Sequence, residues 1–526
     1  VGSEMCIRDS FKDLSDGYDP DLQLTNPLVS VADNARQQSR QTFNYNGSFT
    51  WEFIDNLKFK TEFGLDHYYN KDKRFYGVTT YNSRINGNNQ PIAVFTSKER
   101  KTFRNTNTLN YDFKKILKNK DHSLSLLVGQ ELIKVKSNTD TDEVRFYPKL
   151  FTADQAFNLS SQGTAFSTDK FYNADDILLS YFARANYDFQ GKYLASATFR
   201  ADGSSKFSKD NRWGFFPSVS LGWVMSEEDF FKDALPKIDY FKLRGSFGIL
   251  GSDNVSAFLY RKSYSYTNNG VVFGSTPNTQ GTLSNTVAYP NERLTWEKTK
   301  SYNLGFDLSA WNGLLGVEFD VFYKYTYDIL QSVSNIYPPS LGGHYPSSEN
   351  TGTFDNRGFE IALKHRNRIG EFSYSLNGNL SYAHNRILSR TQADNTLPWQ
   401  SVLGSSVGEL WGLKALGLYQ SEEEIANSPQ VSWNTPRVGD IKYADINGDG
   451  KIDSNDRIKI SRGIRPEMMF ALMADANYKG FDLSVQFQGA ALCDKMLQYS
   501  WQDLNGATDM TPMTCLLYTS PSPRAS

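Results

Sequence analysis

Alternation of apolar and polar residues over ten or more positions limits this chain to β-structure. From Leu315 to Asp328, one set of alternate residues is apolar or aromatic and the other is polar or glycine, with Phe322 as the exception. The run from Phe372 to Tyr382 alternates in the same way, with serine and asparagine as its polar set. Successive residues on a helix turn by about 100°, so the apolar set of such a run would surround the helix. The pattern therefore predicts long strands with one apolar and one polar face.

Aromatic residues are frequent in a chain whose average residue is hydrophilic. Phe, Tyr and Trp make up 14% of the residues, while the mean hydropathy is −0.53. A soluble protein would bury so many rings in a core, whereas a membrane barrel exposes them to lipid on alternate residues. The sequence has no run of about eighteen apolar residues, which excludes helical membrane spans. We therefore expect membrane-crossing strands, each of which needs about 9–11 residues.

The expected strands are joined by connections that alternate between short and long. Tight links lie at Asp55-Asn56, Gln190-Gly191-Lys192, Asn312-Gly313, Ile369-Gly370 and Lys479-Gly480, with two somewhat longer links at 115–121 and 226–237. Long polar loops lie between them at about 71–100, 141–177, 253–296, 329–352 and 387–467, together with a compact loop at 203–212. This sorting is typical of transmembrane barrels, which have short periplasmic turns and long extracellular loops.

The pattern gives about fourteen strands, an even number as antiparallel hairpins require. An open sheet of this width would leave unpaired edges in lipid, so we expect the chain to be one part of a larger transmembrane antiparallel β-barrel. A soluble all-β protein, such as a β-propeller or a sandwich array, remains open as an alternative. The sequence has no blade-length repeat with a WD-like signature, which weakens that alternative.

Both ends of the sequence differ from the strands beside them. Residues 1–10 and 515–526 resemble translated adapter sequence, so we expect both to be non-native and assign residues 11–514 to a partial barrel domain. The alternative is that both ends are genuine disordered tails. Cys493 is then the one native cysteine, which excludes a disulfide framework or a thiolate metal site. The 56 Lys and Arg nearly balance the 58 Asp and Glu, so no global field attracts nucleic acid.

Eight short segments of the chain carry a family resemblance. They are FRADGSSKF (199–207), GFFPSVSLGW (214–223), SEEDF (226–230), LRGSFG (243–248), LTWEKT (294–299), NRGFE (356–360), the run from GDIKY (439–443) through DR (456–457), and YKGFDL (478–483). In this order they resemble the barrel of the SusC/RagA family of TonB-dependent outer-membrane transporters. The resemblance covers roughly residues 41 to 500.

The resemblance implies a barrel of about 22 strands with a plugged lumen, of which about 14 strands are present here. It implies a multi-pass barrel in contact with the lipids of the bacterial outer membrane, a SusD-like surface lipoprotein as partner, and import of oligosaccharides or peptides. Energy would come from the TonB complex through the plug and an N-terminal segment, which we expect to lie outside this sequence, as does the signal peptide. Substrate would pass polar lumen residues such as Glu318, Asp320 and Lys324. No enzymatic activity is expected.

The run from Asp445 to Asp456 (DINGDGKIDSND) matches an EF-hand-type calcium loop. Calcium prefers six to eight oxygen ligands, and Gly450 permits the sharp turn that gathers them. The expected ligands are the side chains of Asp445, Asn447, Asp449, Asp453 and Asp456 together with the backbone carbonyl of Lys451. The alternative is a plain turn cluster, which Asn, Asp and Gly also form for backbone reasons. We expect a structural Ca²⁺ ion that makes a long external loop rigid.

The aromatic residues of the long loops are a second candidate site. Tyr260, Tyr264, Tyr266 and Phe273 lie in the 253–296 loop, and Trp399, Trp411 and Trp433 lie in the 387–467 loop. Such rings can stack on sugar faces or on peptide side chains, and Tyr and Trp add a hydrogen-bonding group. For any single ring, packing within the loop or anchoring at the membrane interface is the favoured interpretation.

Other chemistry finds little support in the sequence. The five histidines, His67, His122, His344, His365 and His384, have no metal-ligand spacing, and no nucleotide-binding or nucleophile motif is present. Two functional alternatives to the importer remain. One is a passive porin or adhesin barrel, and the other is a surface glycan-active β-protein.

Overall fold

A computed structural model describes residues 18–19, 24–25, 33–113, 121–267, 283–333, 336–341, 345–393 and 395–494. Its dominant feature is one antiparallel sheet of fifteen strands. Fourteen of them follow one another in an unbroken path, and β7 (Thr164–Tyr172) pairs with β6 off this path. The strands of the path are β3 (Asn34–Ile54), β4 (Leu57–Tyr76), β5 (Ile92–Asp112), β6 (His122–Arg145), β8 (Asp176–Phe189), β9 (Tyr193–Ser204), β10 (Trp213–Val224), β11 (Ile238–Ser252), β14 (Glu297–Ala310), β15 (Leu315–Ser332), β16 (Ser348–Ile369), β17 (Phe372–Ser389), β24 (Met468–Tyr478) and β25 (Phe481–Ala491).

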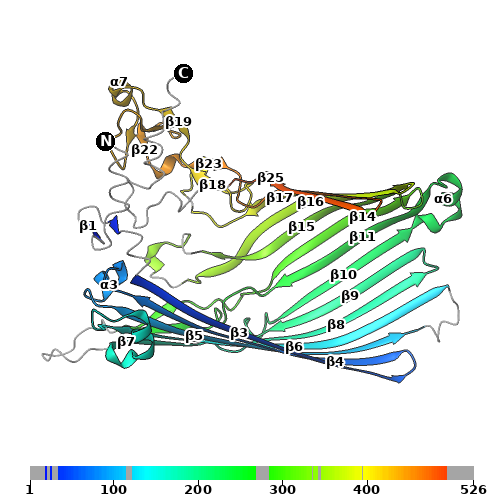
Figure 1. Ribbon diagram of the computed structural model, residues 1–526, viewed down its shortest axis with the longest axis horizontal. Helices are drawn as coiled ribbons and strands as arrows, with labels where there is room; N and C mark the ends of the chain where they lie inside the picture. Colours follow the sequence, from blue (N-terminus) through cyan, green and yellow to red (C-terminus); the bar gives the residue numbers. More distant parts are fainter. Residues whose placement is uncertain are drawn as a thin grey trace.

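The sheet curves into an open trough, in which each of the fourteen long strands pairs with the next long strand along the chain (Figure 1). Within the described residues, β3 and β25 each pair with a single neighbour and form the two edges of the sheet. This arrangement confirms the predicted all-β antiparallel barrel wall and the predicted count of about fourteen strands. The predicted non-native ends, residues 1–10 and 515–526, lie outside the described residues.

The tight links lie where the sequence predicts them. Each contains an Asn or a Gly, which readily accept the left-handed backbone that hairpin turns require, and at two links a Gln or Lys adopts it as well. Asn56 has a φ of 67°, Gln190 and Gly191 have 55° and 67°, and Lys479 and Gly480 have 49° and 86°. All tight links lie at one end of the trough, beside α6 (Asp229–Ala234), and the long connections lie at the other end (Figure 1). The predicted sorting of short and long loops is therefore confirmed.

The predicted loops at 71–100 and 141–177 are shorter than expected. β4 continues to Tyr76, β5 begins at Ile92, and β6 reaches Arg145 in a strand of 24 residues. These strands are about twice the length that a membrane crossing needs. Their outer ends carry polar residues on both faces, as in Lys71-Asp72-Lys73-Arg74, so the alternation that revealed the strands disappears there.

Aromatic rings of the apolar face form rows across neighbouring strands. Phe306 of β14 lies 5.6 Å from Phe319 of β15, Phe319 lies 6.4 Å from Phe359 of β16, and Phe359 lies 5.8 Å from Tyr382 of β17, measured between ring centroids. Such cross-strand pairs stabilise a sheet without a separate core. Many apolar side chains of this face are exposed, for example Leu304 (67%) and Phe487 (64%). A surface of this kind is suited to contact with lipid.

Most of the short elements lie at the long-loop end, whereas η2 (Met225–Glu227) adjoins α6 at the tight-link end (Figure 1). Helices α3 (Tyr81–Asn86) and α5 (Ala153–Asn158) lie over the tips of β4–β6, where Phe75, Ala93, Val144, Tyr147 and Ala156 form a buried cluster. The remaining short elements are β1 (Tyr18–Asp19), β2 (Leu24–Thr25), β12 (Ser263–Thr267), β13 (Leu283–Ala288), β18 (Leu410–Gly412), β19 (Ala415–Leu418), β20 (Gln430–Val431), β21 (Ile441–Tyr443), β22 (Lys451–Ile452), β23 (Ile458–Ser461), α7 (Glu422–Ala426) and the 3₁₀ turns η1 (Ser160–Gln162), η2 (Met225–Glu227), η3 (Pro339–Leu341), η4 (Pro398–Gln400) and η5 (Ser454–Asp456). None of the helices in the described ranges is long and apolar enough to cross a membrane.

Candidate functional site

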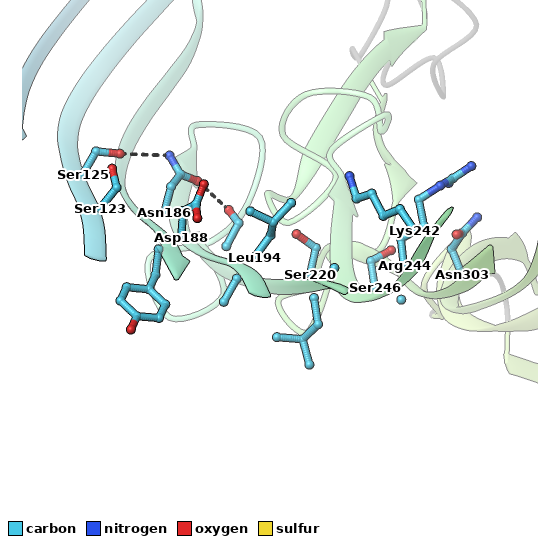
Figure 2. A pocket seen from close by; sticks show the side chains of 16 residues that line it. Ser123, Ser125, Asn186, Asp188, Leu194, Ser220, Lys242, Arg244, Ser246 and Asn303 are labelled. Carbon is cyan, nitrogen blue, oxygen red and sulfur yellow. Dashed lines mark hydrogen bonds between the residues drawn. The ribbon is translucent and has the colours of Figure 1, made fainter. Parts of the chain in front are cut away.

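The polar face of the sheet carries a hollow near the tight links (Figure 2). Its volume is about 490 Å³, and its lining comes from six neighbouring strands, β6, β8, β9, β10, β11 and β14. Figure 2 shows Ser125 and Asn186 on one side and Lys242, Arg244 and Asn303 on the other. Asn186 Nδ2 donates to Ser125 Oγ at 3.3 Å, and Ser196 Oγ donates to Asn186 Oδ1 at 2.8 Å. The hollow thus offers many hydroxyl and amide groups and a pair of cations.

Arg244 is held by two carboxylates from β14 and β15, the next two strands of the sheet after β11. Its Nη2 donates to Asp320 Oδ2 at 2.6 Å, and its Nε donates to Asp307 Oδ1 at 3.1 Å. Arg244 lies directly opposite Gly305 on β14, and Gly305 lies directly opposite Asp320 on β15. Because Gly305 has no side chain, the guanidinium can cross β14 and reach the aspartate beyond it. A Cβ at Gly305 would lie 2.5 Å from Asp320 Oδ1.

A second arginine cluster lies on the same face, on β6, β8 and β9. Arg200 Nη2 donates to Glu131 Oε2 at 2.9 Å and to Ser180 Oγ at 2.8 Å, and its Nε donates to Asp202 Oδ1 at 2.7 Å. The guanidinium carbon also lies 5.5 Å from the centre of the Phe182 ring, within the range of a cation–π contact. Both arginines are therefore neutralised within the wall.

The three predicted lumen residues lie together on the polar face of β15. Asp320 pairs with Arg244, and Glu318 Oε1 accepts a hydrogen bond from Lys364 Nζ at 2.7 Å. Lys324 Nζ lies 5.1 Å from the centre of the Phe322 ring. The arginines that neutralise the wall were not singled out from the sequence. Gly305 could have indicated one of them, because a glycine within an alternating run leaves room for a long side chain from the next strand to cross.

The predicted calcium loop forms one turn of chain on the long-loop side. Asp445 accepts hydrogen bonds from the N–H groups of Gly448 (2.7 Å) and Gly450 (2.9 Å), and Asp449 accepts one from Lys451 (2.8 Å). Asn447 Oδ1 accepts from the N–H of Asp449 at 3.0 Å, and Asp453 Oδ1 accepts from the N–H of Asn455 at 2.7 Å.

Asp456, the last residue of this loop, is fully buried. Its two oxygens accept hydrogen bonds from the N–H groups of Ile446 (2.8 Å) and Asp453 (2.9 Å). In the described ranges, no three or more His, Cys, Asp and Glu side chains form a group that could hold a metal ion. The predicted residues therefore lie in one loop, and their side-chain oxygens accept hydrogen bonds from the backbone N–H groups of that loop. Calcium binding stays a prediction.

The aromatic residues of the loops have different surroundings. Trp399 Nε1 donates to the carbonyl of Asn455 at 2.7 Å, which ties it to the end of the calcium loop. Trp411 lies in β18, and Trp433 is 52% exposed with its ring 6.0 Å from that of Tyr443. Tyr260 lies within 5.6 Å of the Arg261 guanidinium. The side chains of Tyr264 and Tyr266, and all of Phe273, lie outside the described residues.

The loop around Trp433 contains a fixed acidic group. Glu424 of α7 accepts hydrogen bonds from the N–H of Gln420 at 2.8 Å and from Lys442 Nζ at 2.9 Å. These two contacts, the backbone one first, lower the pKa of the Glu424 carboxyl. The group is therefore charged and paired.

The described histidines are spread over the sheet. His67 contacts Glu99, His122 contacts Tyr187, His365 contacts Tyr374 and His384 contacts Glu467, each through one ring nitrogen. His344 lies outside the described residues. The four contacts lie at separate places on the sheet, and the carboxylate partners are shared with cations, Glu99 with Lys101 and Glu467 with Arg462.

Sequence comparison places the chain among known proteins. A profile of the family "TonB dependent receptor-like, beta-barrel" matches residues 8–465. TonB-dependent receptor P3 of Formosa agariphila is 28% identical over 509 residues, which cover 93% of this chain and 48% of that protein. TonB-dependent receptor SusC of Bacteroides thetaiotaomicron is 32% identical over 323 residues, 61% of this chain and 32% of that protein. The chain spans about half the length of the first of these relatives.

Solved structures share the fold. The RagAB peptide importer in its closed-closed state matches with a TM-score of 0.69 and 19% identity over 90% of this chain and 50% of that chain. Another RagAB structure matches with a TM-score of 0.70. The family resemblance of the eight sequence segments is thereby confirmed. The chain belongs to the TonB-dependent receptor-like β-barrel family and lies in the bacterial outer membrane.

Proposed function

We propose that this chain forms part of the wall of a TonB-dependent nutrient importer. The observation that carries the proposal is the division of one curved sheet into an exposed apolar face and a polar face lined with hydroxyl, amide and paired charged groups. A wall of this kind separates lipid from a hydrated passage. Since the family consists of receptors and transporters, we infer that the chain has no catalytic role.

Oligosaccharides and peptides are the proposed substrates. Peptides are supported by the structural comparison, because the matching structures are of the RagAB peptide importer. Oligosaccharides are what the SusC/RagA family resemblance implies. The hollow beside Asn186 presents serine hydroxyls and amides, which can hydrogen-bond to sugar hydroxyls and to peptide groups alike. This chemistry favours neutral polar cargo and leaves both substrate classes open.

Two partners belong to the proposal. A SusD-like surface lipoprotein would meet the long-loop end, where the segment 387–467 stands away from the sheet (Figure 1). The TonB complex would supply energy from the opposite end. A passive porin or adhesin barrel is the competing function, and it would need neither partner.

Uptake measurements in living cells test this proposal. We expect deletion of the gene to abolish accumulation of one labelled oligosaccharide or peptide from a panel of both classes. A protonophore should abolish the same accumulation in cells with the gene, because TonB-driven import needs the inner-membrane gradient. Uptake that persists with the protonophore would establish a passive pore, and substrate cleavage by the purified protein would establish a glycan-active enzyme.

A pair of tryptophan substitutions on β11 provides a matched control. Ser246 lines the polar hollow, whereas Leu243 lies on the apolar face and is 36% exposed. Ser246→Trp adds a bulky ring to the passage and should reduce uptake. Leu243→Trp adds the same ring toward lipid and should leave uptake unchanged. Equal effects of the two substitutions would contradict the assignment of the polar face to the passage.

We also propose that the 445–456 loop binds a structural Ca²⁺ ion. Carboxylate and amide oxygens that accept one N–H each keep a further lone pair, so the hydrogen bonds of Asp445, Asn447, Asp449 and Asp453 are compatible with a hard cation. Chelation should then make the loop more sensitive to protease, and added Ca²⁺ should restore its resistance. Identical cleavage rates with chelator and with Ca²⁺ would show that the loop is a plain turn cluster, which keeps its structure without an ion.

A further inference from the structure

Cations replace apolar side chains toward the long-loop end of the apolar face of β14–β17. Residues that lie directly opposite one another form rows across these strands, and the last row without a charged or histidine side chain is Leu304, Val321, Phe359 and Tyr382. The next row outward is Tyr302, Tyr323, Arg357 and His384, and the one after it is Lys300, Tyr325, Asp355 and Arg386. We call these two outer rows the cationic rows.

The cationic rows share the face of the side chains that point toward lipid. Arg357 lies two residues from Phe359 on the same strand, so the two side chains point to the same side. Arg357 is exposed, and Tyr323, directly opposite it, is 38% exposed. Lys324, between Tyr323 and Tyr325, points to the polar face. The cationic rows are therefore outside the barrel wall and not in its lumen.

The cationic rows also lie at the outer border of the membrane. Arg357 is twelve residues from Ile369, the end of β16 at the tight links, and Lys300 is ten residues from Ala310, the corresponding end of β14. At about 3.3 Å per residue and a tilt of about 45°, these positions are roughly 28 Å and 23 Å above the turns. The apolar band of such a barrel is about 25 Å tall. Lipid headgroups therefore lie at the level of the cationic rows.

Lysines on the other side of the trough mark the same border. Lys101 of β5 and Lys136 of β6 lie directly opposite each other, on the face of Phe103. Lys101 is eleven residues from Asp112, the tight-link end of β5, which places it roughly 26 Å above the turns. The change from apolar to cationic side chains thus occurs at one height on two separate parts of the wall.

The carboxylates beside the cationic rows already have partners. Asp355 has a side chain that is 2% exposed, and its Oδ2 accepts a hydrogen bond from Arg386 Nη2 at 3.0 Å. Glu467 contacts His384 Nδ1 at 2.7 Å and lies 3.6 Å from Arg462 Nη1. Neither carboxylate is left to neutralise a further cation.

Two cations of these rows have no carboxylate of their own. Within the described residues, Arg357 forms no hydrogen bond or ion pair, and Lys300 contacts the Tyr327 ring, with its Nζ 5.3 Å from the ring centre. The hydroxyls of Tyr323 and Tyr325 also have no hydrogen-bond partner in the described ranges. Unpaired charges beside hydrocarbon are costly, so an anion from outside the chain would stabilise this surface.

We propose that the cationic rows bind the phosphate of a lipid headgroup in the outer leaflet. The guanidinium of Arg357 can hold a phosphate through two parallel hydrogen bonds, and the charge of Lys300 adds to the attraction. The Tyr323 hydroxyl can donate a further hydrogen bond. Leu304 and Val321, in the row below, are 67% and 47% exposed and offer an apolar surface to the acyl chains of the same lipid. The site is outside the passage, so it does not depend on the cargo.

Native mass spectrometry of the complete receptor in detergent tests this site. The probes are lipid A with its phosphates and the same lipid after enzymatic removal of the phosphates. We expect the receptor to retain the phosphorylated lipid and to lose the dephosphorylated one. Arg357→Gln combined with Lys300→Gln should weaken binding of the phosphorylated lipid about tenfold, because charge-assisted hydrogen bonds are lost. Equal retention of the two lipids would overturn the proposal.

Two further double variants control for charge and for folding. Lys324→Gln with Lys364→Gln removes the same charge from the polar face of β15 and β16, and should leave lipid binding unchanged. Arg357→Lys with Lys300→Arg keeps the charge and should keep most of the binding. Equal loss in the two glutamine pairs would show a general effect of net charge and refute the site. Displacement of the lipid by inorganic phosphate would show a site for free anions and would also refute it.

Discussion

Two ion pairs on the polar face of β15 should differ sharply in their contribution to stability. Asp320 and Glu318 lie two residues apart and point to the same side. Asp320 takes two hydrogen bonds from Arg244, and its side chain is 16% exposed. Glu318 takes one from Lys364, and its side chain is 50% exposed. Asp320→Asn and Glu318→Gln each remove one charge with little change of shape, so they form a matched pair of perturbations.

The expected magnitudes follow from burial. A hydrogen bond to a charged group contributes about 1.5–3 kcal/mol. Asp320 loses part of two such bonds on change to Asn, while Asp307 still holds Arg244, so we expect the free energy of unfolding to fall by about 2–3 kcal/mol. Exposed ion pairs contribute about 0–1 kcal/mol. Glu318→Gln should therefore be close to neutral.

Urea unfolding of the complete receptor in lipid vesicles, followed by tryptophan fluorescence, measures both values. Gly305→Ala adds a Cβ 2.5 Å from Asp320 Oδ1 and should damage the same contact. Combined with Asp320→Asn, it should cost less than the sum of the single losses, because both changes act on one interaction. Equal losses for Asp320→Asn and Glu318→Gln, or strict additivity with Gly305→Ala, would refute the reasoning.

Three further outcomes can be checked with the same receptor. Burial raises the pKa of Tyr147 to about 12, and its hydroxyl has no hydrogen-bond partner in the described residues, so stability should be full below pH 10 and fall as the pH rises toward 12. Tyr147→Phe should flatten that fall at little cost at pH 7, as unfolding curves across this range would reveal. Asp456→Ala removes the buried acceptor of the loop and should speed proteolysis within 445–456 while the barrel stays intact. Gly129→Ala would overlap the Phe182 ring and should cost about 1–3 kcal/mol, whereas Gly378→Ala, with its nearest neighbour at 3.8 Å, should be tolerated.

Alternation in the sequence predicted the two faces of the sheet and the positions of its turns. Both depend on local chemistry, namely the side-chain period of two and the left-handed backbone of residues such as Asn56 and Gly480. The lengths of the strands could not be predicted as well from the sequence. Beyond the membrane both faces meet water, so a strand such as β4 continues through Lys71 and Lys73 with no apolar set to reveal it.

Pairing across strands could not be predicted from the sequence. Arg244 and Asp320 are 76 residues apart, and their contact depends on the register of two hairpins and on the missing side chain at Gly305. A one-residue change of register would move Arg244 to the lipid face. The 445–456 loop is the opposite case, because the hydrogen bonds from its carboxylates to its own backbone are local and can be expected from the motif, while calcium binding stays a prediction.

The neutralisation of the wall has a consequence for where cargo is recognised. Arg200, Arg244 and Lys364 each form an ion pair with a neighbouring carboxylate. Lys242, which also lines the hollow, has no ion-pair partner among the described residues. A passage must bind its cargo weakly enough to release it, and a wall of paired charges and serine hydroxyls meets that need. Under the proposed importer function, we therefore expect cargo to be selected before entry, at the long-loop end, where Trp433 is 52% exposed. Exchange of the 387–467 segment with that of a relative should therefore change the cargo, whereas exchange of β11 and β14 should change only the rate of uptake.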